Sequence, residues 1–146
     1  MTERAGYRFL DEVTSDLTFE ASGASVSELF AAAAEAMLAA TVEDPDSVAD
    51  RVEERVELSD ERLDWLLRRF LSELVYLRDA EKLLLHARDV QIEGEDPLHL
   101  SAVLTGERFD RARHVPGNEV KAVTAYALSA RRDPDGVWRA RVTLDV

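Results

Sequence analysis

The stretch Leu63 to Val75, LDWLLRRFLSELV, decides the expected architecture because its apolar residues recur every three or four positions. That spacing places them along one side of a helix and predicts a buried stripe. We expect this helix to begin near Ser59 and to form the main pillar of the core. The stripe consists of Leu63, Leu66, Leu67, Phe70, Leu71, Leu74 and Val75.

Another helix is predicted upstream of this stretch. Ser25 and, three positions later, Glu28 form a capping box, in which side chains satisfy otherwise unpaired amides of the first turn. The apolar face behind the cap consists of Leu29, Phe30, Ala33, Met37 and Leu38. Asp44-Pro45-Asp46 marks the turn region after this helix.

The remaining sequence predicts mainly strands. Alternating apolar residues indicate a strand over 17–21, beside which 6–10 can pair. Further strands are expected over 51–58, 83–93, 98–105, 120–128 and 137–146. The turn Asp133-Pro134-Asp135-Gly136 is expected to join the last two as a hairpin. Runs of strands predict an α+β fold, a two-layer antiparallel β-sheet with two main helices packed on it, in one domain over 1–146.

The composition is strongly acidic. Asp and Glu number 30 against 18 Lys and Arg, which gives a formal charge of -12, and cysteine is absent. This charge disfavours direct high-affinity binding to nucleic acid, so an RNA role would run through a partner. An acidic, lysine-poor chain also fits adaptation to high salt, as in a halophilic archaeon. The lack of cysteine, signal peptide and long apolar stretch predicts a cytoplasmic protein that does not enter a membrane.

The motifs of common enzymes are missing from the sequence. The histidines His86, His99 and His114 lack metal-ligand spacing, and we expect them at surface or strand-facing positions. The six glycines stand singly, so they form no phosphate-binding loop. No serine lies in a Gly-x-Ser-x-Gly context. These absences weaken an assignment as an ATP- or GTP-dependent enzyme or as a ligase by itself, and we expect that the protein is not itself an enzyme.

Two aspartates are candidates for metal binding. In the last predicted strand, Asp145 lies on the face opposite the apolar row, next to the terminal carboxylate of Val146. Adjacent carboxylates repel unless a cation or arginine joins them, and a hard divalent cation is one solution. Asp16 stands where a loop enters the strand 17–21. The alternatives are a solvated chain end for Asp145 and a local turn contact for Asp16.

Three charged residues are assigned to partner contact or activation. Lys121 is one of only two lysines in a chain that otherwise uses arginine. Glu73 and Asp79 lie on or just after the helix that begins near Ser59, where a carboxylate is normally only solvated.

Taken together, four segments resemble the archease family: FLSELVYLRDAE at 70–81, GERFD at 106–110, EVKAVT at 119–124 and DGVWRARVTLDV at 135–146. Their order and spacing agree over nearly the whole chain. The resemblance implies an archease-like fold and an accessory role. Proteins of this family activate an RtcB-type tRNA-splicing RNA ligase, promoting its GTP-dependent guanylylation and multiple turnover.

The resemblance also implies a metal site, because the family's ligands match Asp16, Asp145 and Val146. All of these ligands are oxygens, so the expected metal is calcium, magnesium or manganese rather than zinc, with calcium as the first choice. The chain departs from the family pattern at Val13 and Tyr126, where histidines are usual. A proton-transfer role of those histidines is therefore not carried over.

Two other functions stay open from the sequence. A chaperone-like or RNA-modification adaptor would present a similar acidic surface. A stand-alone metal-dependent hydrolase would need a metal-bound water in place of the missing nucleophile and base.

Overall fold

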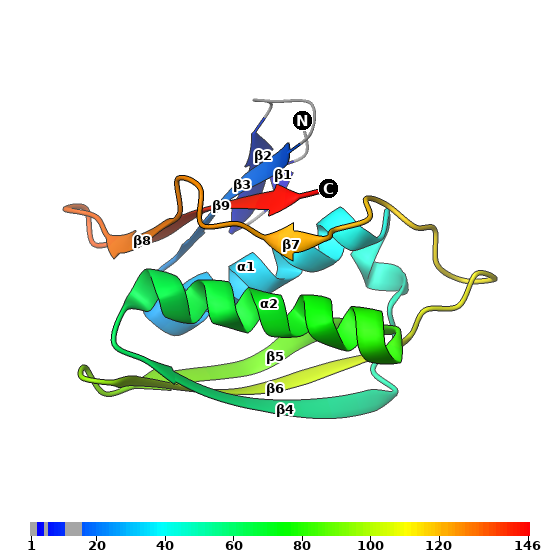
Figure 1. The fold of residues 1–146 in the computed structure, drawn as a ribbon, viewed down its shortest axis with the longest axis horizontal. Coiled ribbons are helices and arrows are strands. Elements are labelled where there is room, and N and C mark those ends of the chain that lie inside the picture. Colours follow the sequence, from blue (N-terminus) through cyan, green and yellow to red (C-terminus); the bar gives the residue numbers. More distant parts are fainter. Residues whose placement is uncertain (1–2, 5, 11–15) are drawn as a thin grey trace.

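Two helices lie between two antiparallel sheets in the computed structural model of the protein (Figure 1). The structure describes residues 3–4, 6–10 and 16–146. Helices α1 (Val26–Thr41) and α2 (Leu63–Glu81) each contact strands of both sheets. The predicted α+β class with two main helices is confirmed, and the two sheet layers cover opposite sides of the helix pair.

The first sheet has β9 near its middle, paired with β3 on one side and with β7 and β8 on the other. The predicted pairing of the first two strand segments is confirmed, because β2 runs antiparallel to β3. The strands of this sheet are β1 (Glu3–Arg4), β2 (Tyr7–Leu10), β3 (Asp16–Gly23), β7 (Ala122–Val123), β8 (Ser129–Arg132) and β9 (Trp138–Asp145).

The second sheet consists of β4 (Val52–Asp60), β6 (Leu98–Arg108) and β5 (Leu83–Glu93), with β6 in the centre. One face is buried against the helices, where Val56 of β4 stands opposite Ala102 of β6. The other face carries exposed polar side chains such as Glu57, because strand side chains alternate between the two faces.

Helix α1 begins as predicted. Ser25 is its N-cap, and the Ser25 hydroxyl oxygen accepts a hydrogen bond from the Glu28 amide at 3.1 Å. The helix is rich in small residues, and Ala33, Ala34 and Ala36 are fully buried. Small side chains allow the helix to lie close to a sheet on each side. A short 3₁₀ helix, η1 (Pro45–Ser47), occupies the predicted turn region.

Helix α2 begins at Leu63, four residues later than expected, because Ser59 and Asp60 complete strand β4. It ends where Lys82 adopts the left-handed conformation, with φ of 60°, and donates its amide to the carbonyl of Arg78. The predicted stripe is buried from Leu66 onward and packs in the same core cluster as Leu144 and the half-buried Trp138.

The predicted strand over 120–128 is wrong in extent, because only Ala122–Val123 is strand. Beyond it the chain turns away from β9, since the Leu128 amide donates to the Ala125 carbonyl and Ala127 has φ of 50°. Alternation of apolar residues suggested a longer strand, but it could not show this local turn.

The predicted hairpin turn is found, but it joins β8 to β9 instead of joining 120–128 to the last strand. The Asp133 amide donates to the Val137 carbonyl at 2.9 Å, which closes the turn. Gly136 has φ of 86°, a positive value that glycine adopts without a steric penalty.

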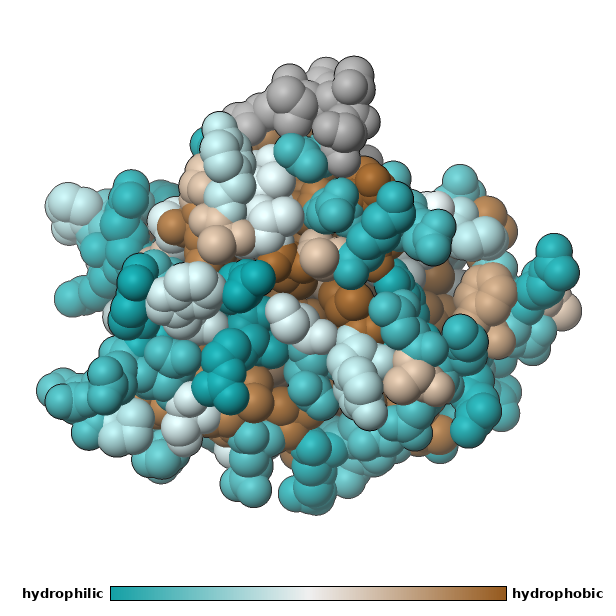
Figure 2. All heavy atoms as spheres, in the orientation of Figure 1, coloured by the Kyte–Doolittle hydropathy of each residue, from teal (hydrophilic) through white to brown (hydrophobic). Residues whose placement is uncertain are grey.

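One face of the molecule is mainly polar. Figure 2 shows hydrophilic side chains over most of one face, with smaller hydrophobic areas between them. No helix in the described part of the chain is long and apolar enough to cross a membrane.

Candidate metal centre

The two predicted aspartate ligands, Asp16 and Asp145, lie together at one end of the first sheet, where β3 begins and β9 ends. They are direct partners in the antiparallel register of these strands. Directly opposed residues project from the same face, with Cβ atoms about 4.5–5.5 Å apart. We call Asp16 and Asp145 the acidic pair. Asp16 is half-buried and Asp145 is exposed.

The alternation of β3 and β9 determines which way the acidic pair points. On the opposite face, Leu17 stands across from Leu144 and packs into the core. On the face of the acidic pair, the next partners are Thr18 and Thr143, whose hydroxyl oxygens are 3.0 Å apart. Both threonines are only 2% exposed, so a buried hydrogen bond joins β3 to β9 next to the acidic pair.

Val146 and Lys121 border the same strand end. The side chain of Val146 is half-buried and packs against the core. The Lys121 amide donates to the Asp145 carbonyl at 2.8 Å, and Ala122 of β7 pairs with Asp145. The backbone of Asp145 is therefore held from both sides, by β3 and by the segment that leads into β7.

The donor chemistry of the acidic pair fits a hard cation. Like charges directly opposite each other across a strand pair are destabilising, and a cation between them removes that repulsion. Within the described ranges, no group of three or more His, Asp or Glu side chains could hold a metal ion. Further ligands would therefore be the predicted Val146 carboxylate or water. Oxygen donors of this kind suit calcium, magnesium or manganese.

Asp79 and Lys121 are connected through the end of α2. The Arg78 guanidinium donates to the Asp79 carboxylate at 2.7 Å and also to the Val120 carbonyl. Val120 directly precedes Lys121, so this contact ties the helix end to the segment beside the acidic pair. Glu73 is half-buried on α2 and takes no part in this connection.

The two positions that depart from the family pattern are Val13 and Tyr126. Val13 lies outside the described residues. Tyr126 lies in the turn between β7 and β8, where its side chain is 72% exposed.

A buried polar cluster surrounds Glu107, near the end of β6, and no motif in the sequence indicated it. Arg113 donates to both carboxylate oxygens of Glu107, and the Ala49 amide donates to one of them. The Arg113 guanidinium above all, with the Ala49 amide and the His114 ring, lowers the pKa of Glu107 to about 2. The cluster fixes the 109–119 loop to the chain that leads into β4.

Two of the three histidines are buried, which corrects the expected surface positions. His114 is 2% exposed: its Nδ1 accepts from the Asp110 amide, so Nε2 carries the proton and donates to Glu107. His86 lies on a strand, β5, but is 5% exposed. Only His99 is exposed on a strand as expected.

The ring of His86 joins α1 to the loop that follows η1. Its Nδ1 lies 2.9 Å from a Glu35 carboxylate oxygen, and its Nε2 lies 3.1 Å from the Val48 carbonyl. Both nitrogens face acceptors, an arrangement that favours a ring with a proton on each nitrogen, and the Glu35 carboxylate raises the pKa of His86. These partners lie 51 and 38 positions away in the sequence, too far for a local pattern to reveal them.

Comparison with known proteins gives one consistent relationship. The model of a family described as "Archease protein family (MTH1598/TM1083)" matches residues 7–146. The protein archease of Methanothermobacter thermautotrophicus is 38% identical over 97% of this chain and 99% of its own length. The protein archease of Pyrococcus furiosus is 36% identical over 92% of this chain and 95% of its own length.

Two solved structures resemble this fold. The solution structure of Methanobacterium thermoautotrophicum protein 1598 superposes with a TM-score of 0.85 at 36% identity, covering 98% of this chain and all of the other. A Thermotoga maritima structure, described as an archease and possible chaperone, superposes with a TM-score of 0.64 at 22% identity, covering 95% of this chain and 97% of the other. At that identity the second likeness concerns the fold alone.

Proposed function

Because the chain belongs to the archease family, we propose that it is a cytoplasmic accessory protein that activates an RtcB-type tRNA-splicing RNA ligase. In this role it promotes GTP-dependent guanylylation of the ligase and its multiple turnover. The observation that carries the proposal is the pairing of Asp16 with Asp145 in the register of β3 and β9. These are the aspartates that match the family's metal ligands.

The residues at the end of the first sheet have distinct roles in this proposal. Asp16, Asp145 and the Val146 carboxylate would hold a divalent cation, with calcium the first choice and magnesium or manganese the alternatives. The chemistry supplied there is a concentrated positive charge that can be presented to the ligase. The Thr18–Thr143 hydrogen bond and the backbone contact from Lys121 keep the strand ends that carry the two aspartates in position.

The charge of the chain favours action on a protein over action on RNA. A formal charge of -12 repels phosphate backbones, so the RNA ends are expected to stay with the ligase. The accessory protein then contacts the ligase through residues near the acidic pair, among which we place Lys121 and Asp79. Glu73 is a weaker candidate, because it lies outside the contacts that join α2 to this region.

An RNA ligation assay tests the proposal. Purified ligase of the RtcB type, GTP, divalent cation and RNA with a 3′-phosphate and a 5′-hydroxyl are combined with and without this protein. We expect the protein to raise the number of turnovers per ligase at amounts well below one equivalent. Ligation and guanylylation rates that are the same with and without the protein would refute the proposal.

A chaperone-like role is the second candidate, because the strongly acidic composition also suits the surface of an adaptor that binds a client protein. It predicts that the protein suppresses heat-induced aggregation of the ligase and leaves guanylylation of the folded ligase unchanged. Light scattering at raised temperature, run beside the ligation assay, separates the two. Hydrolysis of a substrate by this protein alone would favour the stand-alone hydrolase instead.

A further inference from the structure

The end of β9 that carries Asp145 is held by segment 120–124, which we call the edge segment. Its Lys121 amide donates to the Asp145 carbonyl at 2.8 Å. Its Thr124 amide and the Thr124 hydroxyl both donate to the Thr143 carbonyl, each at 3.0 Å. Asp145 is the last residue of β9, and strand ends fray unless neighbouring segments hold them. The position of Asp145 therefore depends on how well the edge segment itself is fixed.

Two arginines of α2 bind the other side of the edge segment. Strand β7 is the outermost strand on this side of the first sheet, so a carbonyl on its open side needs a donor from elsewhere. The Arg78 guanidinium donates to the Val120 carbonyl. The Arg68 Nε donates to the Val123 carbonyl at 2.9 Å. Figure 1 shows β7 alongside α2, so the two arginines tie the edge segment to the helix at two points.

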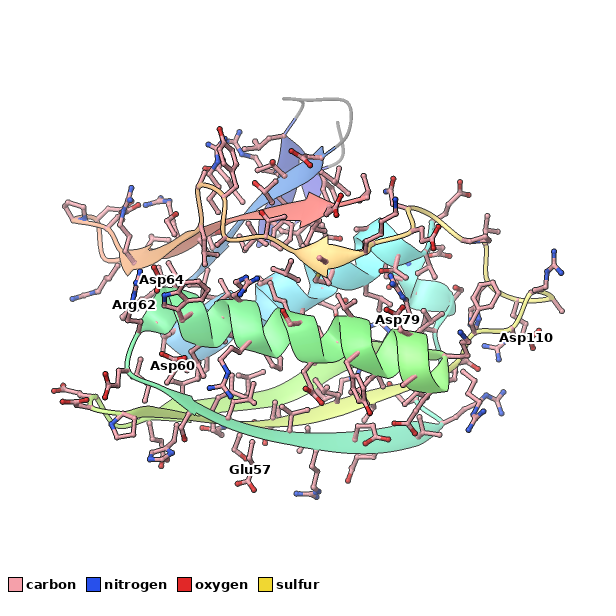
Figure 3. All side chains as sticks on the ribbon, in the orientation of Figure 1. Glu57, Asp60, Arg62, Asp64, Asp79 and Asp110 are labelled. Atoms are coloured by element: carbon pink, nitrogen blue, oxygen red, sulfur yellow. The ribbon has the colours of Figure 1, made fainter. Side chains whose placement is uncertain are left out.

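Each guanidinium is itself held by a neighbour on α2. The Asp79 carboxylate accepts from Arg78 at 2.7 Å, and the Arg78 side chain is only 18% exposed. Figure 3 shows Asp79 near the C-terminal end of the helix. The Arg68 guanidinium carbon lies 5.2 Å from the centre of the Trp65 ring, within the range of a cation–π contact. Guanidinium groups oriented in advance lose less freedom for each hydrogen bond that they form.

These contacts form one connection from α2 to the acidic pair. The helix holds the edge segment through Arg68 and Arg78, and the edge segment holds the end of β9. The register of β9 with β3 then places Asp145 opposite Asp16. Without the arginine contacts, the strand end would be less ordered, and a cation would have to order it on binding. That ordering costs binding free energy, so the affinity for the cation would fall.

We propose that Arg68 and Arg78 are positioning residues of the metal centre, which raise its affinity for a divalent cation without touching the cation. This inference rests on the proposed function and adds two residues that act through Asp145. Charge alone predicts the opposite effect, because each guanidinium repels a cation at the site. The sign of the change in affinity therefore distinguishes positioning from a simple change of charge.

The test compares Arg68→Gln and Arg78→Gln, each made alone, with Arg69→Gln. Arg69 lies on the same helix and also donates to a backbone carbonyl, that of Ser59, but on the side of the second sheet. Its acidic neighbour Asp60 is shown in Figure 3 where β4 leads into α2. All three variants remove one positive charge and one contact to a carbonyl. Calcium affinity is measured by calorimetry well below each Tm, and thermal melts record the loss of stability.

We expect Arg78→Gln to raise the Kd for calcium about tenfold and Arg68→Gln to change it in the same direction. Arg69→Gln should leave the Kd within about twofold, even where its Tm falls as much. Arg78→Lys keeps a charged donor and should recover part of the affinity. Calcium binding that is unchanged or tighter in folded Arg68→Gln and Arg78→Gln would overturn the positioning role and leave the proposed function intact.

The ligation assay separates this inference from the proposed function. At limiting calcium, Arg78→Gln should need about tenfold more calcium than the original chain to reach half of full stimulation. An original chain that stimulates the ligase but binds no calcium, magnesium or manganese would overturn the positioning role alone. An original chain that neither binds a cation nor stimulates the ligase would overturn both.

Discussion

Replacement of Asp145 by asparagine should stabilise the protein without a divalent cation and destabilise it, relative to the original chain, when the cation is present. The reason is the register that places Asp145 directly opposite Asp16. Asparagine keeps the shape of the side chain but removes one of the two opposed charges. If Asp145 were only part of a solvated chain end, the change in stability caused by Asp145→Asn would have the same sign with and without the cation.

The expected size follows from the spacing of the two side chains. At about 5 Å, the spacing of directly opposed side chains, unit charges interact by about 0.8 kcal/mol in water and about 3 kcal/mol at an effective dielectric constant of 20. Asp145 is exposed, so the lower value applies, and relief of the repulsion is expected to add about 1 kcal/mol to the free energy of unfolding. For a chain of this size that raises Tm by about 2–4 °C.

With the cation present the order reverses. A cation at 100 times its Kd stabilises the original chain by about 2.7 kcal/mol, which corresponds to a rise in Tm on the order of 5–10 °C. Asp145→Asn should lose most of that gain. Thermal melts in chelator and in increasing calcium measure both effects, and Glu57→Gln serves as the control for an exposed carboxylate on the other sheet. Melts of Asp145→Asn and the original chain that coincide at every calcium concentration would refute the shared site.

Three further changes test other parts of the structure. Glu107→Ala leaves the buried His114 donor and the Ala49 amide without their acceptor, which costs about 1–3 kcal/mol for each donor. Urea unfolding should therefore show that the free energy of unfolding falls by about 3 kcal/mol or more. A fall below about 0.5 kcal/mol would contradict a structural role for the cluster. Because the pKa of His86 is raised in the folded state, the protonated ring contributes its full stabilisation below about pH 6.5, and that stabilisation is lost as pH rises through the folded-state pKa. His86→Gln should therefore flatten the decline in the free energy of unfolding measured from pH 6 to 9. Equal slopes for the variant and the original chain would argue against a charged His86. Extension of the chain beyond Val146 by a short tag should abolish ligase stimulation with little change in Tm, and full stimulation by a folded, tagged protein would exclude the terminal carboxylate as a ligand.

Local periodicity predicted the elements whose burial is one-sided. In α2 from Leu66 onward, and in β3 and β9, one face of the element is buried. The spacing of apolar residues along the sequence therefore predicts both the type of element and its buried face. The end of the strand predicted over 120–128 could not be located in this way. There the decisive feature is a turn at Ala127 with positive φ, which no residue type in that segment signals.

The candidate site depended on long-range pairing. The sequence showed that Asp145 points away from the apolar row, but only the resemblance to a family placed Asp16 with it. The structure supplies the register that makes them partners. The Glu107 cluster and the Glu35–His86 contact were missed for the same reason, because their donors and acceptors come from separate elements and leave no periodic trace.

The central position of β9 in the first sheet has a consequence for how the protein folds. Thr18 and Thr143, which meet across β3 and β9, are 125 positions apart in the chain. During synthesis β2 and β3 emerge early, and one edge of β3 stays unpaired until β9 has been made. Closure of so large a loop is slow, and an open strand edge is prone to pair with other chains in the meantime. The acidic pair thus forms only in the last step of assembly, so a nascent or truncated chain cannot engage a cation there ahead of the complete fold.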